Sequence, residues 1–283
     1  MKTNTLYDHI RLGYNSTRKA DSFITERLFQ LLAPRSNNLY LDIGCGTGNY
    51  TIALANKGLR FYGLEPSEEM LSTARQKNDE INWLRGNAEK IPLIDNVFDG
   101  AIATLTIHHW VNLKKAFKEI ARVVKPGGPV IIFTALPEQM QYFWLNYYFP
   151  MMLRNSITQM PGYYEIEAAA LEADLSIKKT ESYFIQDNLE DHFLYVGKNR
   201  PELYFNEYVR KGISSFAALA NKDEVEAGLS SLAADLANNE FNTVKEIYES
   251  HLGDYIFITL QNKRQLKPLE QCIAFFRKLI TER

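Results

Sequence analysis

The sequence has few cysteines, no long apolar run and no marked excess of either charge. Its two cysteines, Cys45 and Cys272, form no Cys-x-x-Cys pair, so they predict reduced thiols and neither a metal site nor a disulfide. With a net charge of −2, the chain is not drawn as a whole to nucleic acid or to an anionic membrane. No apolar stretch approaches membrane-spanning length, and the polar start MKTNTLYDHI lacks the apolar core of a signal peptide. These absences predict a cytoplasmic protein without metal, membrane or nucleic-acid partners.

The composition is that of an ordinary globular protein, with 46% hydrophobic residues among 283. This length suits one large domain or a domain with a sizeable cap, and no repeat or low-complexity linker divides it. We therefore expect a single domain, 1–283, as a monomer or homodimer, with an N-terminal helical segment at 1–38.

The most informative stretch, 41–51, reads LDIGCGTGNYT. An apolar run leads into it, glycines follow at positions 44, 46 and 48, and a helical pattern leaves it. Glycine reaches positive φ without strain and lets a ligand approach the backbone, while the start of the next helix offers unpaired N–H groups. At the carboxyl end of a parallel strand, such a turn is where open α/β sheets bind ligands.

The glycine spacing narrows the choice of ligand. A dinucleotide fingerprint would need a glycine at Asn49, and a P-loop would need Gly-Lys-Ser/Thr, which this stretch lacks. LDIGCGTG instead resembles the first motif of the class I S-adenosylmethionine (SAM)-dependent methyltransferases, a hydrophobic strand and an acidic residue followed by G-x-G-x-G. The resemblance implies SAM as the cofactor and S-adenosylhomocysteine as the product. The cofactor-binding residues that it implies here are Asp42, Gly44, Cys45 and Gly46.

A second buried strand is predicted at 60–65, and it ends in an acid about twenty residues beyond the glycine turn. A carboxylate there can accept hydrogen bonds from both ribose hydroxyls, or it can simply stand before a helix whose N-cap is Ser67. EPSEEML resembles the second motif of the same family. The resemblance implies cofactor contacts from Glu65 and Pro66, with Met70 packed on the adenine face.

After a predicted third strand at 82–85, the stretch GNAEKIPL stands where the family usually has Gly-Asp-Ala. Asn87 replaces the aspartate, and its amide oxygen can accept the same hydrogen bond from the adenine amino group without a charge. By the same resemblance, Ala88 would present its backbone N–H to the adenine ring.

The stretch VFDGAIATLTIHHW, 97–110, predicts a fourth strand with Thr104 and Leu105 at its carboxyl end. The resemblance implies that these two residues contact the cofactor and that His108 and His109 lie beside the methyl donor. Histidine titrates near neutral pH, so either one can act as a catalytic base if the acceptor must lose a proton. The alternative is a structural role, in which a histidine holds the loop or packs on the adjacent tryptophan.

Residues 5–33 predict an amphipathic helix that ends at Pro34. In many small-molecule methyltransferases a similar Y-x-x-x-R stretch precedes the first strand and closes over the cofactor. The resemblance implies contacts from Tyr14 and Arg18 near the methionine end of SAM. Amphipathic packing with a snorkelling guanidinium is the alternative.

The family motifs cover roughly 39–135 and imply an α/β, doubly wound, Rossmann-like fold with a seven-stranded, mostly parallel sheet. Five parallel strands should come first, and the last strand, 254–262, should be antiparallel. Segments 137–163 and 188–252 are predicted to form a helical cap, and the aromatic and Met side chains of the first suggest an apolar substrate pocket. The other predicted elements are helices at 112–124, 163–175 and 269–280 and a strand at 176–186.

The implied function is in-line transfer of a methyl group from SAM to a small-molecule acceptor. The donor is already activated, so the protein mainly has to align and desolvate the reactants. Acidic residues dominate 221–254, and no Asn/Asp-Pro-Pro-aromatic motif follows the fourth strand, which argues against a nucleic-acid acceptor. Two alternatives stay open: a SAM-binding sensor or regulator without methyl transfer, and a nicotinamide-dependent oxidoreductase, which Asn49 disfavours.

Overall fold

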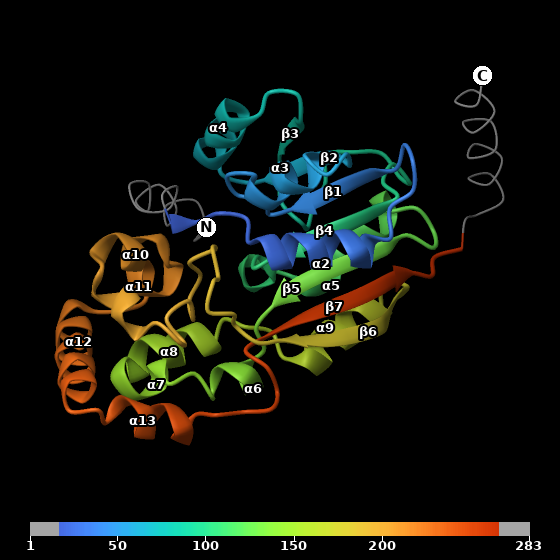
Figure 1. Ribbon diagram of the computed structural model, residues 1–283. Helices are drawn as coiled ribbons and strands as arrows, with labels where there is room; N and C mark the ends of the chain where they lie inside the picture. The colour runs from blue at the N-terminus through green and yellow to red at the C-terminus, as the bar shows by residue number, and fades with distance from the viewer. Residues whose placement is uncertain (1–16, 266–283) are drawn as a thin grey trace.

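The computed structural model describes residues 17–265, and the predictions for Tyr14, Cys272 and the helix at 269–280 lie outside them. Seven strands form one sheet in the order β3-β2-β1-β4-β5-β7-β6 (Figure 1). The neighbours among β1 to β5 pair in parallel, whereas β7 is antiparallel to both β5 and β6. This architecture confirms the predicted fold class. The strands are β1 Leu39–Ile43, β2 Arg60–Glu65, β3 Asn82–Arg85, β4 Gly100–Thr104, β5 Pro129–Thr134, β6 Leu175–Tyr183 and β7 Tyr255–Asn262.

Helices cover both faces of the sheet, and the side chains of each strand alternate between the two layers. In β4, Ala101 and Ala103 pack in the same core as helix α5, whereas Ile102 between them packs in the core that contains α2 and α3. Because both faces of the central strands are buried, β1, β4 and β5 read as nearly continuous apolar runs, whereas the edge strand β6 is largely polar. The covering helices are α2 Ser22–Leu32, α3 Asn49–Ala55 and α4 Glu68–Lys77 on one face, and α5 Leu113–Val123 and α9 Tyr163–Leu171 on the other.

A cap of short helices gathers at one end of the sheet (Figure 1). It comes from two separate parts of the chain, one after β5 and one between β6 and β7. The cap helices are α6 Pro137–Met140, α7 Leu145–Tyr148, α8 Pro150–Ile157, α10 Glu207–Gly212, α11 Ser214–Ala218, α12 Lys222–Ala237 and α13 Phe241–Ile247. Two 3₁₀ turns, η1 Ile107–His109 and η2 Pro201–Phe205, complete the described elements. In the part of the chain that is described, no helix is both long and apolar enough to span a bilayer.

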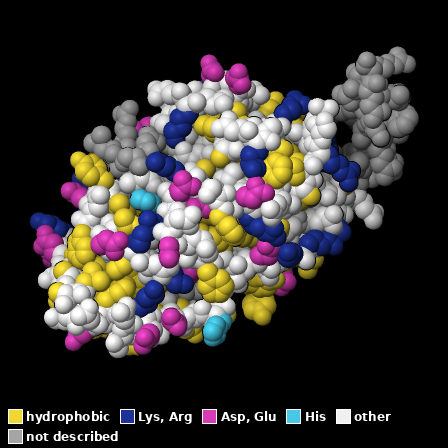
Figure 2. Space-filling view, viewed as in Figure 1, with side chains coloured by type: hydrophobic (Ala, Val, Ile, Leu, Met, Phe, Trp, Pro, Cys, Tyr) yellow, Lys and Arg dark blue, Asp and Glu magenta, His cyan; other side chains and the backbone are white. Residues whose placement is uncertain are grey.

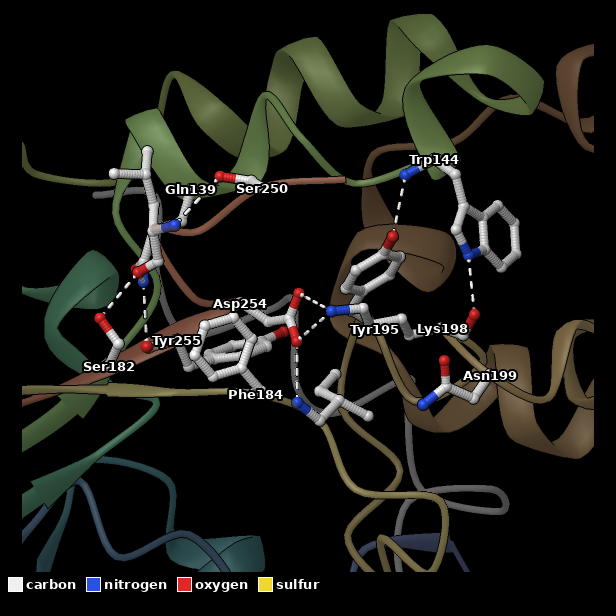
Figure 3. Close-up of polar contacts among 12 residues, drawn as sticks. Gln139, Trp144, Ser182, Phe184, Tyr195, Lys198, Asn199, Ser250, Asp254 and Tyr255 are labelled. Atoms are coloured by element: carbon white, nitrogen blue, oxygen red, sulfur yellow. Dashed lines mark hydrogen bonds and ion pairs between the residues drawn. The ribbon is translucent and has the colours of Figure 1, made fainter. Parts of the chain in front are cut away.

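Buried polar contacts fasten the cap to the sheet, as Figure 3 shows. The ammonium group of Lys198 lies 2.7 and 2.8 Å from the two carboxylate oxygens of Asp254, just before β7. The backbone N–H of Trp144 donates to the hydroxyl of Tyr195 at 3.0 Å, and the Gln139 amide donates to the carbonyl of Tyr255 at 2.9 Å. Since these groups are largely removed from water, their loss would leave unpaired polar atoms inside the protein. These contacts join the cap to the strand β7 and its two parts to each other.

The prediction of an unbroken helix over 5–33 is wrong for its described part. The chain is not helical at 18–21, and α2 begins only after Asp21, whose carboxylate accepts the N–H of Ile24. The carbonyls of Thr17 and Arg18, which a helix would use internally, accept instead from the His192 N–H and the Asn49 amide. These tertiary hydrogen bonds are invisible to a local apolar pattern, which explains the error.

One glycine of the cap generates a stability prediction. Gly228 lies inside helix α12, where a Cβ would meet the Tyr148 carbonyl at 2.3 Å and the Phe149 ring at 2.5 Å. Alanine usually stabilises a helix interior relative to glycine by roughly 0.5–1 kcal/mol. We expect Gly228→Ala to destabilise the protein instead, lowering the free energy of unfolding by about 1–3 kcal/mol, because the added methyl group forces α12 away from α7.

Urea denaturation of the whole chain measures this effect, and Ser231→Ala is the matched control. Ser231 is an exposed position of the same helix, so its substitution should be neutral or slightly stabilising. Equal or higher stability of Gly228→Ala would show that the close approach of the two helices does not constrain this residue.

Candidate functional site

A cavity of about 830 Å³ lies between the carboxyl ends of the strands and the cap. Its floor contains residues that follow β1, β2 and β4, and its roof contains residues of α6, α8, α11 and the loop before η2. The volume is near the upper end of the roughly 300–1,000 Å³ typical of ligand sites. It can therefore hold more than one small molecule at a time.

The glycine turn after β1 packs too closely to admit side chains. Gly44 has φ +70° and Gly48 has φ +77°, both in the left-handed region that favours glycine. A Cβ on Gly44 would lie 2.0 Å from the Thr106 hydroxyl, and one on Gly48 would lie 2.4 Å from the ring of Trp83. The turn thus presents bare backbone to the cavity, as a ligand cradle requires.

Glu65 connects the glycine turn to the next helix. Its carboxylate accepts the N–H of Gly46 at 3.0 Å through one oxygen and the N–H of Ser67 at 3.0 Å through the other. Burial raises the pKa of Glu65, and these two hydrogen bonds oppose the shift. A carboxylate has about four acceptor positions, so Glu65 retains capacity on the cavity side for a hydroxyl donor. Ser67 also caps α4, as its position before the helix predicts, whereas the contact of Glu65 with ribose hydroxyls stays a prediction.

Asp42 lies beneath the turn and does not line the cavity. It is buried, and it accepts a 2.6 Å hydrogen bond from the hydroxyl of Thr51 in α3. Burial raises the pKa of Asp42 to about 7. Its place indicates that Asp42 orients the start of α3 beneath the cavity.

The end of β4 makes a sharp turn into the cavity. Leu105 has φ +53°, an unfavourable conformation for a branched side chain, and its N–H is held by the Phe133 carbonyl at 2.8 Å. The buried hydroxyl oxygen of Thr104 has no hydrogen-bond partner among the described residues. Strain and an unpaired polar atom at one position are typical of a binding site.

The two adjacent histidines of η1 also line the cavity. Their ring centroids are 3.8 Å apart, and Nδ1 of His108 has no hydrogen-bond partner within residues 17–265. Burial lowers the pKa of His109 to about 4 and that of His108 well below its ordinary value, with a further contribution from the neighbouring ring. Both imidazoles are therefore neutral at pH 7, the form that can accept a proton. Trp110 packs edge-on against Phe117 of α5.

Asp191 is a site residue that sequence reasoning missed. It is 1% exposed and receives two contacts from the guanidinium of Arg18, the second at 3.2 Å between Nη2 and Oδ2. The hydroxyl of Tyr50 in α3 donates to the same carboxylate at 3.1 Å. Arg18 and Asp191 are 173 positions apart, and no motif surrounds Asp191, so no signal in the sequence could have paired them.

The structure brings most of the predicted site residues together around this cavity, and it leaves two of them outside. The predicted residues that line it are Arg18, Gly44, Cys45, Gly46, Glu65, Pro66, Met70, Asn87, Thr104, Leu105, His108 and His109. Asp42 and Ala88 are buried next to it without lining it. Burial raises the pKa of the Cys45 thiol well above its ordinary value, so this cysteine is not a reactive nucleophile.

Comparisons with known proteins identify relatives of this arrangement. A family model described as "Methyltransferase domain" matches residues 41–132. A demethylmenaquinone methyltransferase of Bacillus licheniformis is 33% identical over 204 residues, which are 62% of this chain and 88% of that protein. A malonyl-[acyl-carrier protein] O-methyltransferase of Pectobacterium atrosepticum is 34% identical over 113 residues, 40% of this chain and 44% of that protein.

One solved structure resembles most of the chain. It is described as a methyltransferase from an antibiotic biosynthesis pathway of Anabaena variabilis, and its sequence is 35% identical. The match covers 86% of this chain and 98% of that one, with a TM-score of 0.76. The likeness therefore includes both the sheet and much of the cap.

The burial of Asp42 generates a prediction about pH. Its carboxyl binds a proton in the folded protein at pH values where the unfolded chain has released it, so stability present below about pH 4 is lost as pH rises through 7. Since one pKa unit corresponds to ~1.4 kcal/mol, the ionised carboxylate costs on the order of 4 kcal/mol at pH 8. We expect Asp42→Asn to remove this loss, because an amide oxygen still accepts from Thr51.

Urea denaturation at intervals between pH 4 and pH 8 tests the expectation. The stability of Asp42→Asn relative to the wild type should rise across this range. Asp223→Asn, at an exposed position of α12, should keep the wild-type profile. Parallel profiles for wild type and Asp42→Asn would show that Asp42 does not titrate there.

Proposed function

This chain belongs to the class I SAM-dependent methyltransferases, and we propose that its methyl acceptor is a small molecule enclosed between the glycine turn and the cap. The observation that carries the proposal is the continuity of the cavity. Gly44 and Glu65 on the floor and Ile213 on the roof line the same space of about 830 Å³. The similarity of the chain to enzymes that transfer methyl groups favours methyl transfer over the sensor and oxidoreductase alternatives.

We propose that the floor of the cavity holds SAM. Glu65 would accept from the ribose hydroxyls, while Met70 and Asn87 would contact the adenine. The bare backbone of the glycine turn would face the methionine part. Arg18 supplies a positive charge at the cavity wall beside this turn, so it would lie near the methionine carboxylate.

When bound, SAM supplies a methyl group that its sulfonium has already activated, and the carbon–sulfur bond breaks as the bond to the acceptor forms. The chain has to align the acceptor and exclude water, and the cap can do both. Where the accepting atom loses a proton, the neutral imidazole of His108 would take it through Nδ1. His109 packs against that ring and would hold its orientation.

The surface supports a small acceptor over a nucleic acid. In Figure 2, Lys and Arg side chains alternate with Asp and Glu over the visible face, without a large patch of one sign. Nucleic-acid binders instead gather their cations on one face. Cys45 is a free thiol, in keeping with a protein of the reducing cytoplasm, which we also propose.

Glu65→Ala should weaken SAM binding by about tenfold to a hundredfold, because a hydrogen bond to a charged group contributes roughly 1.5–3 kcal/mol. Isothermal titration calorimetry with SAM measures this change. Because Glu65 also holds Gly46 and Ser67, the circular dichroism spectrum of the variant must first match that of the wild type.

Glu172→Ala is the control for this experiment. Glu172 forms a surface ion pair with Lys114 and does not line the cavity, so the affinity for SAM should not change. Unchanged affinity in a folded Glu65→Ala protein would remove Glu65 from the cofactor site.

The class of acceptor is tested with SAM that carries a radiolabelled methyl group. The protein is incubated separately with total RNA, total protein and a small-metabolite fraction, each from the source cells. We expect label in the metabolite fraction, because the cap covers the cavity and a macromolecule would have no open surface there on which to bind. Incorporation confined to RNA or protein would overturn the enclosed-acceptor proposal.

A further inference from the structure

The roof of the cavity has a consistent chemical character. Seven roof residues have apolar side chains, and three of them, Met140, Phe193 and Ile213, are at most 4% exposed. The apolar roof residues are Met140, Met160, Phe193, Leu194, Ile213, Ala218 and Leu219. A wall of this kind gains free energy by covering apolar surface of a ligand.

The polar groups of the roof carry little charge. They are the hydroxyls of Ser156, Ser214 and Ser215, the amide of Gln159 and the carboxylate of Asp191. Ser156 donates its proton to the Met152 carbonyl of its own helix at 2.9 Å. Asp191 is already bonded to Arg18 and Tyr50. The roof therefore offers no unpaired charge to a ligand within the described chain.

Cations are also scarce around the rest of the cavity. Among the described lining residues the only ones that carry a full positive charge are Arg18 and Arg85. Arg18 is ion-paired with Asp191, and the proposal above assigns it to the methionine carboxylate of SAM, so it is not available to an acceptor. Arg85 lies next to Glu65 at the end of β3, the strand farthest in the sheet from β7 and the cap. A phosphate, sulfate or carboxylate under the roof would thus be buried without a counter-charge, which strongly disfavours its binding.

Among the acceptors on the floor, His108 is the neutral base candidate. Nδ1 of His108 is buried and has no partner within the described residues, and the charge of Arg18 adds to the burial that keeps this imidazole neutral. A neutral imidazole has one nitrogen that donates and one that accepts. An O–H or N–H group of an acceptor would satisfy the second.

We propose that the methyl acceptor is an uncharged, predominantly apolar molecule whose O–H or N–H group bonds to His108 beneath the apolar roof. This inference rests on the proposed enclosure of a small acceptor and adds its chemical class. Apolar area buried against the roof supplies the affinity. Selection against anions follows from the absence of a cation available to the acceptor in the described lining. Selection against cations follows because Asp191, the only carboxylate among the described roof residues, is paired with Arg18.

The labelled products of the small-metabolite fraction test this class even though the acceptor is unidentified. At pH 7 the products are extracted into ethyl acetate, and the extract and the aqueous phase are passed separately over an anion and a cation exchanger. We expect the label to enter the organic phase and to pass both exchangers. Label retained by either exchanger, beyond the unreacted SAM that a sample without protein retains, would overturn the inference while leaving an enclosed acceptor in place. Absence of label from all metabolites, with SAM binding intact, would instead defeat the proposed function.

A matched pair of leucine substitutions tests the role of the roof. Leu219→Lys places a charge on the apolar roof, whereas Leu171→Lys places one on an exposed position of α9, 68% accessible and outside the cavity. We expect Leu219→Lys to lower the rate of labelled-product formation at least about tenfold, because an apolar acceptor cannot bind against the roof without burying the unpaired ammonium group. Calorimetric affinity for SAM should change less than about twofold, which shows that the site is folded.

Leu171→Lys should retain both the rate and the affinity of the wild type. A Leu219→Lys protein that forms the product at the wild-type rate would show that the acceptor does not lie against the roof, and the inference would fail.

Discussion

The cavity floor depends on one buried carboxylate that two turns share. Glu65 accepts from Gly46 and from Ser67, so the turn after β1 and the start of α4 are held by the same side chain. β1 and β2 pair in parallel, which brings their carboxyl ends to one edge of the sheet. Glu65 thus adds a side-chain hydrogen bond to the backbone bonds from Gly44 and Cys45 to the Leu64 carbonyl that hold the glycine turn. The local sequence motifs and the pairing of β1 with β2 thus favour the same arrangement of the cavity floor.

The roof depends on aromatic packing across the junction of cap and sheet. Phe133 of β5 lies 5.6 Å from the ring of Tyr255 in β7 and 6.1 Å from that of Phe193, whose own ring lies 4.7 Å from Tyr255. Such ring pairs contribute beyond the area that they bury. The Lys198–Asp254 ion pair lies beside this cluster, where its separation would leave a largely buried charge without a partner. Phe193 also lines the cavity, so the cluster that fixes the cap forms part of the acceptor wall.

Several titratable groups are buried at the site, and their burial shifts their pKa values and reduces the stability of the fold. The histidines of η1 are kept neutral by removal from water, which lowers their pKa values and leaves a ring nitrogen able to accept a hydrogen bond. The same environment raises the pKa values of Asp42 and Glu65, which disfavours their ionised forms. A domain of this size can tolerate these costs because two large apolar cores lie on either side of the sheet. Perturbed groups gathered at one cavity are characteristic of functional sites.

Short-range patterns in the chain were enough to predict the sheet, the glycine turn and most of the floor. These patterns are alternate glycines, an acid at the end of β2, and a His-His pair after β4. Strand order places these motifs at one edge, where the family resemblance of the sequence also puts Gly44, Glu65 and His108. The cavity wall at Arg18 and Asp191, and the non-helical stretch before α2, depend instead on long-range packing. Arg18 finds Asp191 across 173 positions, and the hydrogen bonds of Thr17 and Arg18 to distant groups interrupt the predicted N-terminal helix. The residue pattern of a segment does not reveal such distant contacts, because each contact depends on how the whole chain packs.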